Sequence, residues 1–340
     1  MSNLTHSFGN GTGTGNRTLL EDPKLCTLET CDLTLASFLY IPTLPGNASY
    51  AAIFGVLTIG QLYLGIRHKT WGYMAAMVLG LVLEIIGYVA RVMLHNSPFN
   101  DDNFLMYLIT LTIAPAFLSA AIYLCLSRIV VVYGAHLSRF KPRTYTIFFC
   151  TCDIVSLVLQ GAGGGIAASA DTADLTDLGK NIMLAGLAFQ VVSLTVFAIC
   201  STDFAFRAYK GRTLWNREHL RLVNSKLFNA FLLGLVVATV TIFARSVYRC
   251  VELSGGFNGE LFVKDEALFM VMEGVMIVIA CVCLTVLHPA ICFQGAWHNA
   301  NFSFRSSKFI VEFPLRGLES LDPMSCDTNW ADKNGGTFMS

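Results

Sequence analysis

Three acidic side chains stand inside long apolar stretches of the sequence. They are Glu84, Asp153 and Glu273, and each stretch is long enough to cross a bilayer. A charged group is costly in hydrocarbon, so an acid at that depth marks an ion or proton path or a partner for a cationic group, unless it is protonated or hydrogen-bonded and only locks helices together. Glu84 lies about halfway through its stretch, which makes it the first candidate for chemistry.

Two arginines lie near the predicted outer ends of apolar stretches. Arg91 is two helical turns from Glu84, a rise of roughly 10.5 Å, which is too far for a direct ion pair within one helix. One interpretation is that Arg91 and Arg245 extend their charged ends to the membrane surface, as long basic side chains commonly do. The alternative is a network in the outer half of the membrane that joins Arg91, Arg245 and Glu273.

Uncharged polar residues extend this set. Tyr88 is one turn from both Glu84 and Arg91 and can present its hydroxyl to either. Gln160 and Gln190 fall near mid-membrane, where their amides need interhelical hydrogen bonds or a wet cavity. The candidates for a substrate or translocation path are therefore Glu84, Tyr88, Arg91, Asp153, Gln160, Gln190, Arg245 and Glu273.

Two further features concern the shape of the apolar stretches. Pro115 is expected to interrupt the third stretch and to open backbone groups toward a cavity. Four glycines fall within residues 161–165 of the fourth stretch. They predict a close-packed or kinked helix rather than a ligand loop, because the Lys of a phosphate-binding loop is missing.

Several kinds of site are absent from the sequence. There is no G-x-x-x-x-G-K-[ST] motif, so the chain does not bind ATP through a P-loop. There is neither an H-E-x-x-H motif nor a paired C-x-x-C to hold a metal. No nucleophile-and-base set of an enzyme is recognisable. We expect no cofactor, no metal, no nucleic-acid partner and no enzymatic activity.

The elements that must position the polar candidates are membrane helices. Hydrophobic residues make up 54% of the chain and charged residues only 14%, which is too little polar surface for a soluble globule. Seven apolar segments of about 20 residues each follow a polar head. They cover residues 48–66, 71–94, 104–126, 146–168, 181–200, 228–247 and 267–287. The predicted fold is an all-α bundle of seven transmembrane helices.

The basic residues predict the orientation of this bundle. The first, third and fifth connections are rich in Lys and Arg, whereas the second has none and the fourth sets Lys180 against three acids. The sixth connection is assigned Arg249 and Lys264. Because basic connections stay on the cytoplasmic side, the N-terminus is predicted outside and the C-terminus inside.

The chain divides into three parts. Residues 1–47 form a polar tail that the charge pattern places outside the cell. Residues 48–290 form the seven-helix domain. Residues 291–340 form a polar cytoplasmic tail without a clear helical period, which is expected to be disordered.

The outer tail carries two kinds of modification site. Asn47 is the sequon nearest the membrane, which counts against a glycan there. Cys26 and Cys31 are the disulfide candidate, because an extracellular tail is oxidising. The predicted glycosylation sites are Asn3, Asn10, Asn16 and Asn47.

Several runs of the membrane region occur together in a known family. The runs are EIIGYVAR at 84–91, TIAPAF at 112–117, AIYL at 121–124, the segment 149–160 with Asp153, GLAFQ at 186–190, RSVYRCVE at 245–252, Glu266 and the His-Pro pair at 288–289. In this order they resemble the fungal lipid-translocating exporter family, also called RTA-like, which includes sphingoid-base exporters and aminocholesterol-resistance proteins. The resemblance implies a seven-span plasma-membrane protein connected with the movement or toxicity of amphipathic lipids, some members being linked to porphyrin export.

The leading hypothesis is an ATP-independent transporter that exports amphipathic lipid-like molecules, such as sphingoid long-chain bases or sterol-like toxins. Its partners would be membrane lipids and this cargo, with the buried acids facing a cationic head group. The alternative is a seven-transmembrane receptor or lipid sensor, which shares the orientation and the basic fifth connection. Against it, the third segment ends without D-R-Y, and His288-Pro289 stands where N-P-x-x-Y is expected. Cargo, direction, energy source and oligomeric state are left open by the sequence.

Overall fold

The computed structural model describes residues 42–170, 172–212, 220–255, 266–295 and 297. Within these ranges the chain is helical and has no β-strand, and seven helices are long and apolar enough to span a membrane. The predicted all-α fold with seven spanning helices is therefore confirmed. The candidates that lie outside the described residues are Asn3, Asn10, Asn16, Cys26 and Cys31.

Six spans are single helices, and the seventh is built from three pieces. The single helices are α2 (Leu44–His68), α3 (Trp71–Asn96), α4 (Asp101–Tyr133), α5 (Pro142–Ala168), α6 (Ala173–Lys210) and α8 (Lys226–Ser254). The seventh span comprises α10 (Glu266–Phe269), the π-helical stretch η6 (Met270–Val275) and α11 (Met276–Val286). Short elements at the ends of spans are η3 (Ala135–Leu137), α7 (Leu220–Val223) and α12 (Pro289–Cys292).

Local sequence signals set several helix ends. Pro45 and Pro142 lie in the first turns of α2 and α5, where the missing N–H removes no helical hydrogen bond. The Asn100 side chain caps α4 by accepting a hydrogen bond of 3.0 Å from the backbone N–H of Asp102. Gly134 ends the same helix with a φ of 122°, a conformation that favours glycine. These signals fix where α2, α4 and α5 begin and where α4 ends.

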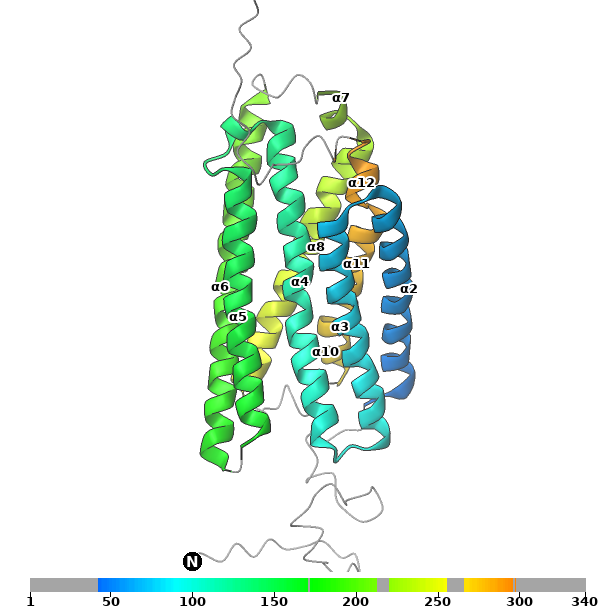
Figure 1. The fold of residues 1–340 in the computed structure, drawn as a ribbon, viewed down its shortest axis with the longest axis vertical. Coiled ribbons are helices and arrows are strands. Elements are labelled where there is room, and N and C mark those ends of the chain that lie inside the picture. Colours follow the sequence, from blue (N-terminus) through cyan, green and yellow to red (C-terminus); the bar gives the residue numbers. More distant parts are fainter. Residues whose placement is uncertain (1–41, 171, 213–219, 256–265, 296, 298–340) are drawn as a thin grey trace, which may run out of the picture. The chain divides into compact units, whose positions relative to one another are not determined.

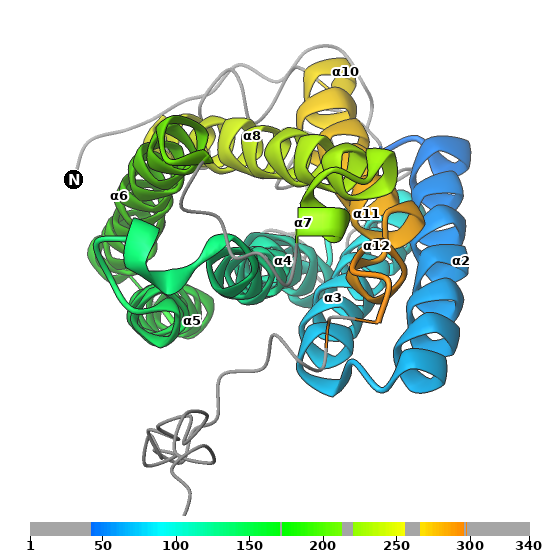
Figure 2. The same cartoon turned by 90° about the horizontal axis from the view of Figure 1, so that it is seen from above.

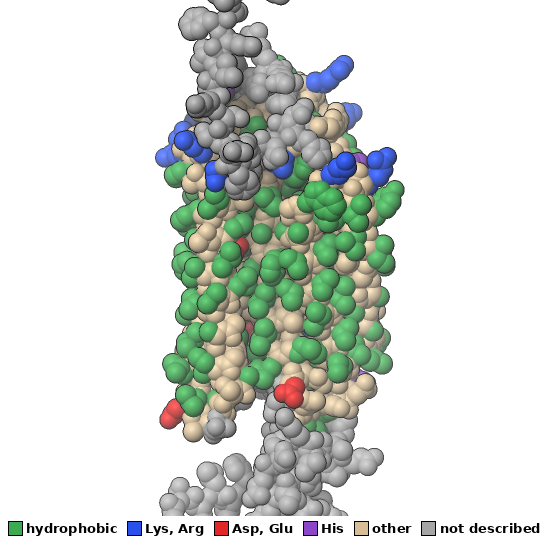
Figure 3. All heavy atoms as spheres, in the orientation of Figure 1, with side chains coloured by type: hydrophobic (Ala, Val, Ile, Leu, Met, Phe, Trp, Pro, Cys, Tyr) green, Lys and Arg blue, Asp and Glu red, His purple; other side chains and the backbone are tan. Residues whose placement is uncertain are grey.

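Consecutive spans run antiparallel (Figure 1). Seen along the helices, α5 and α6 stand on one side, α2 and α3 on the other, and α4 and α8 lie between them (Figure 2). Lys and Arg gather where α2, α4 and α6 finish, which we call the basic end (top of Figure 3). Asp and Glu mark the opposite end, and an apolar belt lies between them. This asymmetry is the one that the connections predicted.

The α5–α6 pair packs through its glycines. A Cβ added at Gly163 would lie 2.5 Å from the Met183 nitrogen, and one added at Gly179 would lie 2.6 Å from the Ala167 nitrogen. Only glycine permits this backbone approach, so close packing was the correct interpretation of the glycine cluster at Gly163. Gly161 and Gly165 have open space around them, and α5 runs through the cluster as one helix.

Several helices are longer than the apolar segments predicted. α6 has 38 residues, a length of about 57 Å, whereas the predicted fifth segment covers only 181–200. α8 continues to Ser254 and carries Arg249 into the interior, where the residue is 1% exposed. The assignment of Arg249 to the sixth connection was therefore wrong. Its removal from that connection makes the charge difference between the two ends larger.

The segment after the seventh span packs back onto the bundle. Phe293 and Trp297 are buried, and the Phe293 ring lies 5.4 Å from the ring of Phe228 on α8. The Arg128 guanidinium lies 3.9 Å from the centre of the Trp297 ring. The packed domain thus extends past residue 290 to at least Trp297, because aromatic side chains of the predicted tail cover the basic end.

Candidate functional site

Glu84 is enclosed in the centre of the bundle. The α3 helix holds it at 0% exposure, and its charged neighbours are Arg245 and Arg249 from α8 and Glu273 from η6. Among the described residues, no donor forms a hydrogen bond with either of its carboxylate oxygens. Glu84 is therefore a buried acid beside two arginines, with no direct partner of its own in the described chain.

Arg245 and Glu273 form a buried ion pair. The Arg245 Nε donates to Glu273 Oε2 at 2.7 Å, and both side chains are 1% exposed. The Arg245 Nη2 also donates to the Leu111 carbonyl on α4. That carbonyl lies four residues before Pro115, which has no N–H to donate to it. Pro115 thus leaves an acceptor for a buried arginine.

The expectation that Pro115 interrupts the third span was wrong. α4 runs without a break from Asp101 to Tyr133 with the proline inside it. The neighbouring helix supplies a substitute donor through Arg245, which is how proline is tolerated within membrane helices.

Sequence reasoning missed two members of this cluster, Arg249 and Glu252. The Arg249 Nη1 lies 2.5 Å from Glu252 Oε2, and its Nε lies 3.3 Å from Glu273 Oε1. Both side chains of the first pair are 2% exposed. The signal was their spacing, because Arg245, Arg249 and Glu252 follow one another at i, i+4 and i+7 on one helical face. We call Glu84, Arg245, Arg249, Glu252 and Glu273 the buried charge cluster.

Arg91 is fully buried, so it does not reach the membrane surface as one interpretation expected. Its Nε donates to Asn47 Oδ1 at 3.1 Å, and its guanidinium lies 3.9 Å from the centre of the Phe269 ring. The Tyr107 ring lies 5.2 Å from Arg91 and 5.9 Å from Arg249. A shared aromatic ring therefore links Arg91 to the buried charge cluster.

Asn47 cannot carry a glycan in this packing. It is 0% exposed, its Nδ2 donates to the Thr43 carbonyl at 2.7 Å and its Oδ1 accepts from Arg91. The predicted glycosylation of Asn47 is incompatible with the fold, because its amide is a structural link between α2 and α3.

Tyr88 lies on the α2 side of the cluster. Its ring centre is 5.1 Å from that of Tyr50 and 5.7 Å from that of Phe54. The Tyr50 hydroxyl donates at 2.9 Å to the carbonyl of Met270, the first residue of the π-helical stretch. Aromatic packing thus joins α2 and α3 to the segment that carries Glu273.

The polar candidates of α5 and α6 form separate sites. Gln160 Nε2 donates to Gln190 Oε1 at 2.9 Å in the interior, so an interhelical hydrogen bond supplies the partner of this amide. Asp153 is 3% exposed and lies beside Tyr123 of α4. The Tyr123 ring centre is 4.5 Å from that of Phe197 on α6. Asp153 is therefore not part of the buried charge cluster.

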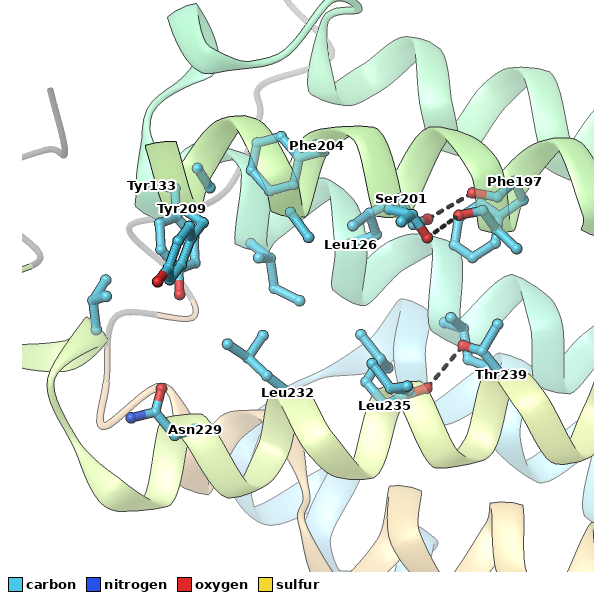
Figure 4. A pocket seen from close by; sticks show the side chains of 18 of the residues that line it. Leu126, Tyr133, Phe197, Ser201, Phe204, Tyr209, Asn229, Leu232, Leu235 and Thr239 are labelled. Atoms are coloured by element: carbon cyan, nitrogen blue, oxygen red, sulfur yellow. Dashed lines mark hydrogen bonds between the residues drawn. The ribbon is translucent and has the colours of Figure 1, made fainter. Parts of the chain in front are cut away.

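A cavity of about 710 Å³ lies between α4, α6 and α8 (Figure 4). Its walls are mostly apolar, with Leu126, Phe204 and Leu232 among them. None of the sequence-predicted substrate residues lines it. Sequence reasoning missed the cavity because its residues resemble any apolar helix face, and only the arrangement of three helices reveals the space.

The hydroxyl groups in the cavity wall are engaged by their own helices. Ser201, Thr202 and Thr239 donate to carbonyls four residues earlier, at 2.7, 2.8 and 2.8 Å. Such back-bonding leaves the wall with little capacity to bind a polar ligand. The deep part of the cavity is therefore lined by apolar side chains and by hydroxyl groups that already donate to their own helices.

The end of the cavity at the basic end is polar. Tyr133, Tyr209 and Asn229 gather there (Figure 4), and Arg212 and Asn224 complete the lining. The Arg212 guanidinium lies 4.3 Å from the centre of the Tyr209 ring. No acidic residue of the described ranges lines the cavity. In the described part of the chain, no three His, Cys, Asp or Glu side chains come together in a group that could hold a metal ion.

Seven apolar helices around an interior of paired charges define an integral, multi-pass membrane protein. The model of the RTA1-like protein family matches residues 77–296, a range that contains the buried charge cluster and the cavity lining. The chain belongs to this family. The family resemblance found in the sequence is thus confirmed.

Three yeast relatives illustrate the match. The Saccharomyces cerevisiae sphingoid long-chain base transporter RSB1 is 32% identical over 284 residues, covering 75% of this chain and 74% of that protein. Protein RTM1 of the same species is 30% identical over 68% of this chain and 72% of its own. Protoporphyrin uptake protein 1 is 29% identical over 61% and 65%. No solved structure matches.

Proposed function

We propose that the protein transports amphipathic lipid-like molecules across the plasma membrane without ATP, with sphingoid long-chain bases as the first cargo class. The relative named as a sphingoid long-chain base transporter supports the cargo class. The absence of a P-loop from the sequence supports independence from ATP. We assign no enzymatic role.

The cavity supports the lipid-like part of this proposal, because it offers space for the apolar chain of the cargo. The amine head group is assigned to the buried acids instead. The cavity volume of about 710 Å³ falls within the range of roughly 300–1,000 Å³ that ligand pockets occupy. On α8 the lining extends from Asn229 to Val240, a helical rise of roughly 16 Å. That is about half of the ~30 Å hydrocarbon core of a bilayer, so a chain from one leaflet fits the depth of the cavity.

The buried acids divide into two groups under this proposal. Glu273 is already paired with two arginines, which favours a structural role for it. Glu84 and Asp153 are the stronger candidates to meet a cationic head group or a proton, because both are buried and neither is paired with an arginine in the described residues. Asp153 lies beside Tyr123, whose ring contacts Phe197 in the cavity wall.

The test is flux in vesicles that contain the purified protein. A labelled long-chain base should cross faster than in protein-free vesicles, and Asp153→Asn or Glu84→Gln should lower that rate while the folded protein is retained. Asp174→Asn, at an exposed position of α6, is the matched control and should keep the wild-type rate. Absence of protein-dependent flux, with and without a pH gradient, would refute transport. Saturable binding without flux would instead favour the lipid sensor.

A further inference from the structure

The part of the cavity at the basic end, which we call its entrance, carries the cation Arg212, although the proposed cargo is cationic. We infer that this cavity binds a second class of ligand, a single-chain amphipath with a phosphate-type anionic head group held at Arg212. The inference goes beyond transport of an amine, and it does not require that the protein transport anything.

Charge selects the head group. Among the described residues, Arg212 is the only one in the lining with a formal charge, and the exposed amides of Asn224 and Asn229 belong to the same lining. The nearest acid on α6 at this end, Asp203, pairs with Arg139 at 2.9 Å and Arg207 at 3.0 Å instead of facing the cavity. An ammonium group would therefore meet a like charge, whereas a phosphate would meet a guanidinium and amide donors.

The geometry of Arg212 favours this role. Its guanidinium lies over the Tyr209 ring, and this contact restricts a side chain that would otherwise lose much freedom on binding. Guanidinium N–H groups match phosphate oxygens in a bidentate arrangement. The Tyr209 and Tyr133 rings surround the same entrance, where amphipathic side chains commonly meet the head-group level of a membrane.

The walls select the rest of the ligand. Below Arg212 the side-chain hydroxyls are bonded to their own helices, so a chain that enters the cavity meets no competing polar group. The depth of the cavity matches one leaflet. A long-chain amine would compete for the same apolar space while its head group would be disfavoured at the entrance.

The experiment compares three probes of equal chain length, hexadecyl phosphate, hexadecanol and hexadecylamine, on the purified full-length protein in detergent. Hexadecyl phosphate should bind at least about tenfold more tightly than hexadecylamine, because a single charge-assisted hydrogen bond already changes affinity by about tenfold or more. Added salt should weaken this preference because the entrance is exposed. Equal affinity for the phosphate and the amine would overturn the inference.

Two matched pairs of variants test separately the site for the head group and the site for the chain. Arg212→Glu should abolish the preference for phosphate, whereas Lys210→Glu, the same charge change two residues away and outside the lining, should preserve it. Ala205→Trp should fill the cavity and reduce binding of all three probes, whereas Ala230→Trp, exposed and outside the lining, should not. If Arg212→Glu and Lys210→Glu change the preference for phosphate equally, the head-group site is not at Arg212. These readouts are independent of flux, so their failure is distinct from failure of transport.

Discussion

Single residues decide whether charges are tolerated in the interior of this protein. Arg245 is satisfied by Glu273 on one side and, on the other, by a backbone carbonyl that Pro115 leaves without its helical donor. Arg249 shares Glu273 and adds Glu252. Each arginine therefore meets more than one acceptor, as buried guanidinium groups require. Glu84 is the exception, which is why it stays the candidate for chemistry rather than for packing.

Glu273 compensates the charge of two buried arginines. Glu273→Gln should destabilise the fold by about 3–5 kcal/mol, because it leaves two arginines with too little compensating charge in the interior. Asp177→Asn breaks the exposed pair with Lys180, 2.8 Å apart, and should cost less than about 1 kcal/mol. Thermal unfolding of both variants in one detergent checks this. Equal melting temperatures would show that the buried pair has no stabilising role.

His288, just beyond the last span, predicts a pH effect. Burial and the nearby His68 lower its pKa from the usual 6.5 to about 4, and its Nδ1 accepts from the Ala290 N–H at 3.3 Å. Between these pH values the unfolded chain binds the proton more strongly, so stability should fall as pH drops from 6.5 toward 4. The loss approaches about 3 kcal/mol. His288→Asn keeps a capping acceptor without this titration, and its melting temperature should decline less over that range. An identical decline in melting temperature for both proteins would contradict the assignment of this pH effect to His288.

At the scale of elements, hydrophobic length was enough to predict every span. The boundaries failed where a charge ends the apolar run but not the helix. α8 continues past Arg249, which pairs with Glu252 inside, and α6 continues past Asp203, which pairs with Arg207 on its surface. The helix that each polar side chain contacts could not be predicted from the sequence either. The Gln160–Gln190 bond and the cavity depend on which helices are neighbours, which a single sequence does not contain.

The α5–α6 contact supplies the prediction at this scale. Gly163→Ala would place a methyl group 2.5 Å from a backbone nitrogen of α6, so the helices must separate, at a cost of roughly 1–3 kcal/mol. Gly161→Ala in the same helix meets nothing within 4 Å and should be neutral or stabilising by up to about 1 kcal/mol. Melting temperatures of the two variants test this. Equal shifts would show that close backbone approach is not what the glycine provides.

At the scale of the whole molecule, the uneven distribution of charge predicts its orientation. Lys and Arg gather at the end from which α3, α5 and α8 begin, and acids mark the other (Figure 3). We propose that the basic end faces the cytoplasm, because translocation of short basic connections is disfavoured. The cationic entrance of the cavity would then open toward the cytoplasmic leaflet, whose anionic lipids carry the head-group charge that Arg212 favours.

Glycan mapping in a eukaryotic host tests this orientation. With the N-terminus outside, glycosidase treatment should change the electrophoretic mobility of the protein, and joint replacement of Asn3, Asn10 and Asn16 by Gln should abolish that change. Asn47→Gln should leave the glycan pattern unaltered yet lower the melting temperature, because Asn47 binds Arg91 in the interior. A C-terminal tag should resist protease added to sealed cells. A tag accessible to protease, with a mobility change that persists after the joint replacement, would reverse the orientation. It would also place the entrance of the cavity on the outer face.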